Sequence, residues 1–252
     1  MEVLDNIPVK LEPEEVLKLL QLRNRNRNIE TIVEELIEMA QPIAKPKAVY
    51  EVSRIDSRNG DTVDIGGTKF TGRLPRINLE EVERVFPYIT TCGRELDEIV
   101  FPPDDMMRAF CWDAIKLAAL GLVRNYLNDY LIKCYGLGKL SYMSPGDLEF
   151  WPITQQKELF SIFGNVKELI GVELTKSYVM VPTKSSSGIY YPSETEFVDC
   201  KLCPMKRCHV RKAAYDLELA KKYREDTVQS DVIWKRPSGD RVTNKKPKEF
   251  RI

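Results

Sequence analysis

The chain has 252 residues, of which 43% are hydrophobic and 30% charged, and its 38 Lys and Arg residues balance 38 Asp and Glu residues. A zero net charge argues against a general binder of nucleic acid or anionic membranes, because both partners select for a basic surface. With no apolar run long enough to span a bilayer and no basic-then-apolar leader, the sequence predicts a cytoplasmic protein without a nucleic-acid or membrane partner.

Two helices are predicted near the N-terminus. The first runs from Glu12 to Gln21, because Pro13 is a favourable residue for a first helical turn. The second runs from Ile29 to Ala40, where apolar side chains recur at helical spacing, and Pro42 is expected to end it. The basic stretch between the two helices is interpreted as a solvated connection.

A β unit is predicted next. Residues 47 to 73 alternate between apolar and polar on both sides of Asn59-Gly60, which favours a hairpin with its turn there. Asn78 is expected to cap a helix that runs through Val82 and Val85. After it, "PYITTCG" has the pattern of a short buried strand and "RELDEIVF" that of a helix.

The longest predicted helix covers Asp104 to Lys133, with Asp104 as its cap. The segments that follow are a loop, "GLGKLSYMSPGDLEFWP", a helix capped by Thr154, a strand, "VELTKSYVMVP", a turn with a second strand, "TKSSSGIYYP", and a helix from Val210 to Arg224. Strands and helices do not alternate regularly, which favours an α+β fold over a doubly wound parallel sheet. Neither GxGxxG nor GxxxxGK is present, so no motif supports a nucleotide-binding fold.

The segment "DCKLCPMKRCHVRKAAYD" groups Cys200, Cys203 and Cys208 ahead of His209, which is the only histidine in the chain. A loop with this Cys-x2-Cys-x4-Cys spacing can direct three thiolates at one centre, and the basic residues around it favour thiolates. An iron–sulfur cluster, most simply a four-iron one, and a zinc ion both fit three thiolates plus a fourth ligand.

The fourth ligand is open from the sequence alone. His209 is available to zinc, and Cys92, Cys111 or Cys134 to an iron cluster, which also tolerates an open position. Cys111 and Cys134 fall on a predicted helix and are expected to pack in the core, so Cys92 is the candidate ligand outside the motif. The remaining interpretation is that the cysteines bind no metal and are packing or redox-active residues.

The chain contains three segments in this order: "DDMMRAFCWDAIKLAALGLVRNYL", "SYMSPGDLEFWPITQQKELFSIF" and "ELTKSYVMVPTKSSSGIYY". Together they resemble the activation (reactivation) domain of cobalamin-dependent methionine synthase and its stand-alone relatives. The resemblance covers roughly residues 30 to 195. It implies a C-shaped α+β domain with a twisted antiparallel sheet. In that family the domain binds S-adenosylmethionine and docks on the cobalamin-bearing domain, where an electron and then a methyl group restore methylcobalamin.

The resemblance also implies binding residues. The turn Ser144-Pro145-Gly146 matches the family, Ser187, Gly188 and Tyr190 match its Ser-Gly-x-Tyr, and Asp113 matches the acid of an acid–Ala pair on its long helix. Two positions depart from the family: Tyr142 replaces an arginine that helps to hold the methionine carboxylate, and Asp147 replaces an aromatic residue. A carboxylate there should repel a carboxylate ligand, so these departures weigh against S-adenosylmethionine binding.

We therefore expect residues 1–198 to form an activation-like domain, 199–226 a cysteine-bearing segment and helix, and 227–252 an extended or disordered tail. The expected function is reductive activation of a corrinoid methyltransferase, with an iron–sulfur cluster that delivers electrons to the corrinoid. The alternatives are an S-adenosylmethionine-binding methyl-donor domain with structural zinc, and a non-catalytic docking module for a corrinoid protein.

Overall fold

The computed structural model describes residues 1–5, 7–22, 26–208 and 211–225. Its centre is an eight-stranded antiparallel sheet. The strands are β1 (Glu2–Leu4), β2 (Lys47–Tyr50), β3 (Ser53–Asn59), β4 (Thr62–Ile65), β5 (Thr68–Thr71), β6 (Arg84–Thr91), β7 (Leu140–Met143) and β10 (Ser185–Pro192). Strands β8 (Glu173–Leu174) and β9 (Met180–Val181) form a separate short pair.

Strand β6 lies in the middle of the sheet and is almost entirely buried. One edge of β6 pairs with β10, from Ser185 opposite Thr91 to Tyr190 opposite Phe86, and β7 pairs with the outer edge of β10. The other edge of β6 is shared by β2 and the start of β3. Strand β6 thus joins the hairpin half of the sheet to the half that carries the predicted binding residues.

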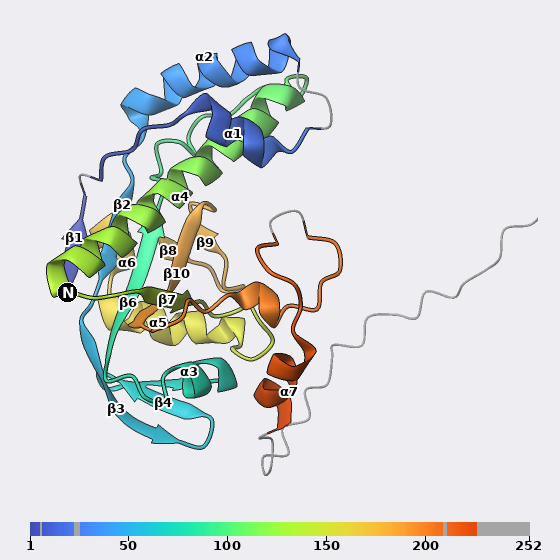
Figure 1. Cartoon of the computed structure of the whole chain (residues 1–252). Coiled ribbons are helices and arrows are strands. Elements are labelled where there is room, and N and C mark those ends of the chain that lie inside the picture. Colours follow the sequence, from blue (N-terminus) through green and yellow to red (C-terminus); the bar gives the residue numbers. More distant parts are fainter. Residues whose placement is uncertain (6, 23–25, 209–210, 226–252) are drawn as a thin grey trace, which may run out of the picture.

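The helices are α1 (Pro13–Leu20), α2 (Arg27–Ile43), α3 (Arg73–Asn78), α4 (Met106–Tyr135), α5 (Gln156–Phe163), α6 (Val166–Ile170) and α7 (Leu217–Glu225), with 3-10 turns at Ile153–Gln155 and Asp199–Lys201. Figure 1 shows a curved outline, with α1, α2 and the start of α4 at one end and α3 with the β3–β4 hairpin at the other. The predicted C-shaped α+β fold is confirmed. No described helix is long and apolar enough to cross a membrane.

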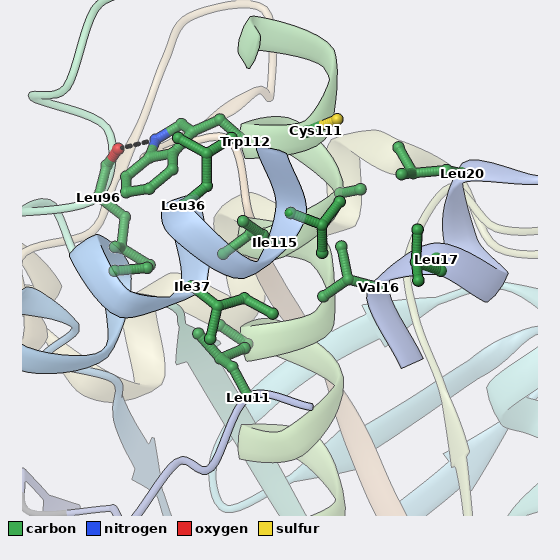
Figure 2. Close-up of a cluster of buried hydrophobic side chains, with 14 of the residues drawn as sticks. Leu11, Val16, Leu17, Leu20, Leu36, Ile37, Leu96, Cys111, Trp112 and Ile115 are labelled. Carbon is green, nitrogen blue, oxygen red and sulfur yellow. Dashed lines mark hydrogen bonds between the residues drawn. The ribbon is translucent and has the colours of Figure 1, made fainter. Parts of the chain in front are cut away.

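The helical end has its own core, in which α1 and α2 pack on the first half of α4 (Figure 2). Trp112 and Ile115 of α4 meet Leu36 of α2 and Val16 of α1 there. The indole N–H of Trp112 donates a hydrogen bond to the carbonyl oxygen of Leu96 at 2.8 Å, which satisfies the one polar atom of a buried ring. The apolar faces that the sequence predicts for these helices therefore form this core.

Several predicted elements are confirmed with small changes in their bounds. Helix α1 opens at Pro13, and the β3–β4 hairpin turns at Asn59-Gly60. Asp105, and not Asp104, caps α4, because its carboxylate accepts a hydrogen bond from the N–H of Arg108. Pro42 lies inside the last turn of α2, since the helix continues to Ile43.

Two predicted helices are wrong. Asn78 is the last residue of α3 and does not cap a new helix, because the Arg58 side chain binds the carbonyl oxygens of Leu79 and Val82 and the chain then enters β6. The segment "RELDEIVF" forms only turns. There the side chain of Asp97 is held by Lys116 of α4, at 2.6 Å, and by the N–H of Thr183. Tertiary contacts outweigh helix propensity in both places.

Three other predicted segments differ in extent. The predicted strand "VELTKSYVMVP" is reduced to β8 and β9 around a turn. Thr154 lies within a 3-10 turn, and Gln155 stands at the start of α5 instead. The C-terminal helix begins only at Leu217, and the predicted tail, 227–252, lies outside the described residues.

Candidate functional site

A groove of about 520 Å³ lies between the second half of α4 and strands β7 and β10. Helix α4 lines it with Gly121, Arg124, Asn125, Asn128 and Ile132, and the sheet lines it with Leu140, Tyr142 and Tyr190. Glu196 and Lys212 close one side, so the segment after β10 forms part of the wall.

Tyrosine rings form the floor of the groove. The ring centroids of Tyr88 and Tyr190 lie 4.5 Å apart, and those of Tyr142 and Tyr190 lie 5.9 Å apart. The Tyr190 hydroxyl donates a hydrogen bond to the carbonyl oxygen of Arg124 at 3.2 Å, which fixes the sheet against α4. Burial is the main cause that raises the pKa of both Tyr88 and Tyr190, so both phenols remain protonated at neutral pH.

The predicted Ser-Gly-x-Tyr residues lie on two faces of β10, because side chains alternate along a strand. Gly188 and Tyr190 share the face of α4, where Gly188 stands opposite Tyr88. Ser187 stands opposite Ile89, which packs against α5 and α6 on the other face. The Ser187 hydroxyl is buried there and has no hydrogen-bond partner among the described residues.

The turn Ser144-Pro145-Gly146 lies beside Gly188. A Cβ at Gly188 would overlap the carbonyl oxygen of Met143 and come within 2.9 Å of the Ser144 hydroxyl, so only glycine allows this close approach. Gly146 has a φ of +92°, a left-handed conformation, and its N–H bonds the carbonyl oxygen of Trp151. The structure therefore brings the Ser144 turn, Gly188 and Tyr190 together.

Asp147 follows that turn and is solvent-accessible while being surrounded by protein on most sides. This partial burial, together with the nearby charge of Asp199, raises the pKa of the Asp147 carboxyl to about 6, although Arg124 and the Ser144 hydroxyl act in the opposite direction. The groove therefore has a carboxyl beside it that changes charge within the physiological range.

Arg124 is the central cation of the groove. The centre of its guanidinium lies 4.4 Å from the centroid of the Tyr142 ring, which is a cation–π contact. Its Nε atom is buried and has no hydrogen-bond partner among the described residues. The sequence-based prediction did not include Arg124. The recurrence of Gly121, Arg124, Asn125 and Asn128 on one face of a largely apolar helix is the signal that identifies it.

Asp113 lies outside this groove. Its carboxylate pairs with the ammonium of Lys184 at 2.9 Å, just ahead of β10. The neighbouring pair of Lys116 and Asp97 also joins α4 to this end of the sheet. In the structure Asp113 therefore fastens α4 to the sheet.

Cys92 is fully buried in the core of the helical end, in the same cluster as Cys111. Burial, with the nearby carboxylate of Asp97, raises the pKa of the Cys92 thiol to about 12, so the protonated thiol is its stable form. Cys203 instead packs against the cluster at the opposite end, around Trp151. The structure thus places Cys92 in a different core from the cysteine segment.

The three clustered cysteines are half-buried in a loop held by Arg211. The Arg211 guanidinium donates hydrogen bonds to the carbonyl oxygens of Cys200, Cys203, Met205 and Ala213. The N–H of Lys212 donates to the Cys200 sulfur at 3.3 Å, and the same residue lines the groove.

Within the described residues no group of three His, Cys, Asp or Glu side chains is placed to hold a metal ion, and His209 lies outside those residues. In the described arrangement the sulfurs of Cys200, Cys203 and Cys208 are therefore not gathered around one centre.

No family model and no curated protein matches this sequence. Among solved structures, the chain is similar to the crystal structure of the MetH reactivation domain bound to AdoHcy, with a TM-score of 0.54. The match has 13% sequence identity and covers 79% of this chain and 81% of that one. At this identity the likeness establishes the fold, which is the one that the sequence segments predict.

Proposed function

We propose that the protein is a reactivation partner of a corrinoid-dependent methyltransferase and that its groove binds an S-adenosyl compound. The observation that carries the proposal is a fold shared with a domain that binds AdoHcy, in a chain with a tyrosine-floored groove between α4 and the sheet. Tyr142 and Tyr190 offer aromatic rings to a flat base, and the charged groups beside them offer contacts to a polar tail.

In this proposal the chain's own residues bind and orient the methyl donor next to a docked corrinoid protein.

The first test is calorimetric titration of the full-length protein with S-adenosylmethionine and S-adenosylhomocysteine. Tyr142→Ala is expected to weaken binding about tenfold, because a ring contact of about 1.4 kcal/mol is lost. Tyr126→Ala is the matched control, since Tyr126 stacks on Tyr130 on α4 but does not line the groove. Absence of binding in the wild type would contradict the methyl-donor part of the proposal.

The corrinoid part has its own test. The cobalamin-binding domain of methionine synthase, loaded with cob(II)alamin, is mixed with this protein, a chemical reductant and S-adenosylmethionine. Methylcobalamin, followed by its absorption spectrum, is expected to form only when this protein is present. Formation of a complex without methylcobalamin would instead favour a non-catalytic docking module.

A second candidate function is electron delivery by a metal cluster on the cysteine segment. The observation that favours it is the position of this segment, because Lys212 both contacts the Cys200 sulfur and lines the groove. Anaerobic purification with iron and acid-labile sulfide analysis tests it. Iron and sulfide together would support the candidate, and zinc alone would favour a structural site.

A further inference from the structure

The groove has an excess of positive charge in its lining. The lining contains three cations, Arg124, Lys139 and Lys212, and one acid, Glu196. None of the three cations forms an ion pair with an acidic side chain in the described part of the chain. Arg124 influences the carboxyl of Asp147 electrostatically, but it makes no ion pair with it. Positive groups without an acidic partner in a concave site favour an anionic ligand.

Arg124 is the cation that is already held in place. Its guanidinium rests on the Tyr142 ring, and its own carbonyl oxygen accepts the hydrogen bond from Tyr190. A guanidinium that lies against an aromatic ring keeps its N–H groups in its own plane. There they can form two parallel hydrogen bonds to a carboxylate or phosphate. The buried Nε, which has no partner among the described residues, is one donor of such a pair.

Lys139 and Lys212 differ from Arg124 in this respect. Both are exposed, and lysine is a flexible point charge without a planar fork. They increase the positive potential at the rim, whereas Arg124 has the geometry for a directed contact.

Resting on the proposed function, we infer that Arg124 is the anion-binding residue of the groove and holds the charged group of a nucleoside ligand through a guanidinium stacked on Tyr142. The charged group is either the carboxylate of an amino-acid tail or a phosphate, because both accept two parallel N–H donors. Arg124 would thereby decide which adenosine derivatives bind tightly.

The test uses three ligands that share adenosine and differ in their tails: S-adenosylhomocysteine with a carboxylate, adenosine 5′-monophosphate with a phosphate, and 5′-methylthioadenosine without an anion. Each is titrated calorimetrically into the full-length protein. We expect the wild type to prefer one anionic ligand over 5′-methylthioadenosine by at least about tenfold, the factor expected for one charge-assisted hydrogen bond. The ligand that shows the preference identifies the source of the anion.

Arg124→Gln is expected to abolish that preference, and circular dichroism with the urea midpoint of the variant checks that it is folded. Arg124→Lys keeps the charge without the fork and is expected to recover only part of the preference. Lys133→Gln, at an exposed position on the same helix, is the matched control and should behave as the wild type.

Two results would overturn the inference and are distinguishable. If the wild type prefers an anionic ligand and Arg124→Gln keeps the preference, the groove binds nucleosides but Arg124 is not the anchor. If the wild type binds none of the three ligands, the proposed S-adenosyl function fails as well.

Discussion

At the scale of single residues, Asp147 is a carboxyl whose charge near neutral pH depends on its surroundings. Its pKa rises from an ordinary 3.8 to about 6 in the folded chain. The folded state therefore binds this proton more tightly than the unfolded state. The contribution of Asp147 to stability is fully present below pH 4 and is lost as the pH rises through about 6.

Asp147→Asn is accordingly expected to raise the free energy of unfolding at pH 7 by about 1 kcal/mol, a value discounted because the carboxyl touches solvent. The gain should shrink towards pH 4, where the native carboxyl is protonated. Urea unfolding at several pH values measures it, with the exposed Asp104→Asn as control. A variant less stable than the wild type at pH 7 would show that the carboxylate is stabilising instead.

At Gly188 the neighbouring strand leaves no room for a side chain. Gly188→Ala places a methyl group against Met143 and Ser144, so we expect a loss of about 1–3 kcal/mol in the free energy of unfolding. Gly121→Ala, in the same groove but with open space around its Cβ, should gain about 1 kcal/mol, because alanine favours the helix. Chemical denaturation of both variants compares them, and equal effects would contradict the close approach of β10 and β7.

At the scale of elements, one side chain makes several of the hydrogen bonds that hold the cysteine loop together. Arg211 satisfies four carbonyl oxygens between residues 200 and 213. Carbonyl groups in a loop need such partners when they are taken from water, and a guanidinium has enough donors to serve them all.

Arg211→Ala is expected to open this loop and to speed the reaction of Cys200 and Cys203 with a thiol reagent at least about tenfold, since a hydrogen bond to a charged group is worth about 1.5–3 kcal/mol. Mass spectrometry of the labelled protein identifies each site. Exposed Cys134 gives the rate of an unprotected thiol and buried Cys111 that of a protected one. Lys206→Ala is the control, and an unchanged rate in Arg211→Ala would mean that the loop is held by other contacts.

Long elements with a strong pattern are predictable and short ones less so. Helix α4 has thirty residues of helical pattern, and its prediction is in error by only two residues at each end. The segments after Asn78 and around Leu96 have a helical pattern over a shorter span. There the Arg58 and Asp97 side chains bind distant partners, which local sequence does not reveal.

At the scale of the whole molecule, β6 connects the separate cores. Val85 packs towards α3, Phe86 and Tyr88 towards α4, Ile89 towards α5 and α6, and Cys92 just beyond it towards α1 and α2. The C-terminal segment joins the same body, because Tyr223 packs beside Phe150 and its carbonyl oxygen accepts a hydrogen bond from Arg73 at 2.7 Å. A strand shared by three clusters, and joined to the fourth by Cys92 directly after it, should make unfolding cooperative.

We therefore expect a single unfolding transition. Trp112 reports the helical end and Trp151 the opposite end, and both are buried. In variants that keep only one of these two tryptophans, with the others changed to Phe, urea midpoints from fluorescence and from circular dichroism should coincide. Different midpoints in either variant would show that the two ends unfold independently.

Local sequence is enough to predict the class of fold, the hairpin turn at Asn59-Gly60, the amphipathic helices of the helical end and the segments that resemble a reactivation domain. These depend on local backbone preferences and on a periodicity that survives in any compact arrangement. The folded arrangement was needed to show that Gly188 and Tyr190 face α4 while Ser187 faces away, and that Cys92 and Cys203 lie in different cores. It was also needed to show that Arg124 stands over Tyr142, the position where the sequence had shown only a missing arginine. The reason is that such contacts join residues far apart in the chain, so strand pairing and helix packing, and not neighbouring residues, determine them.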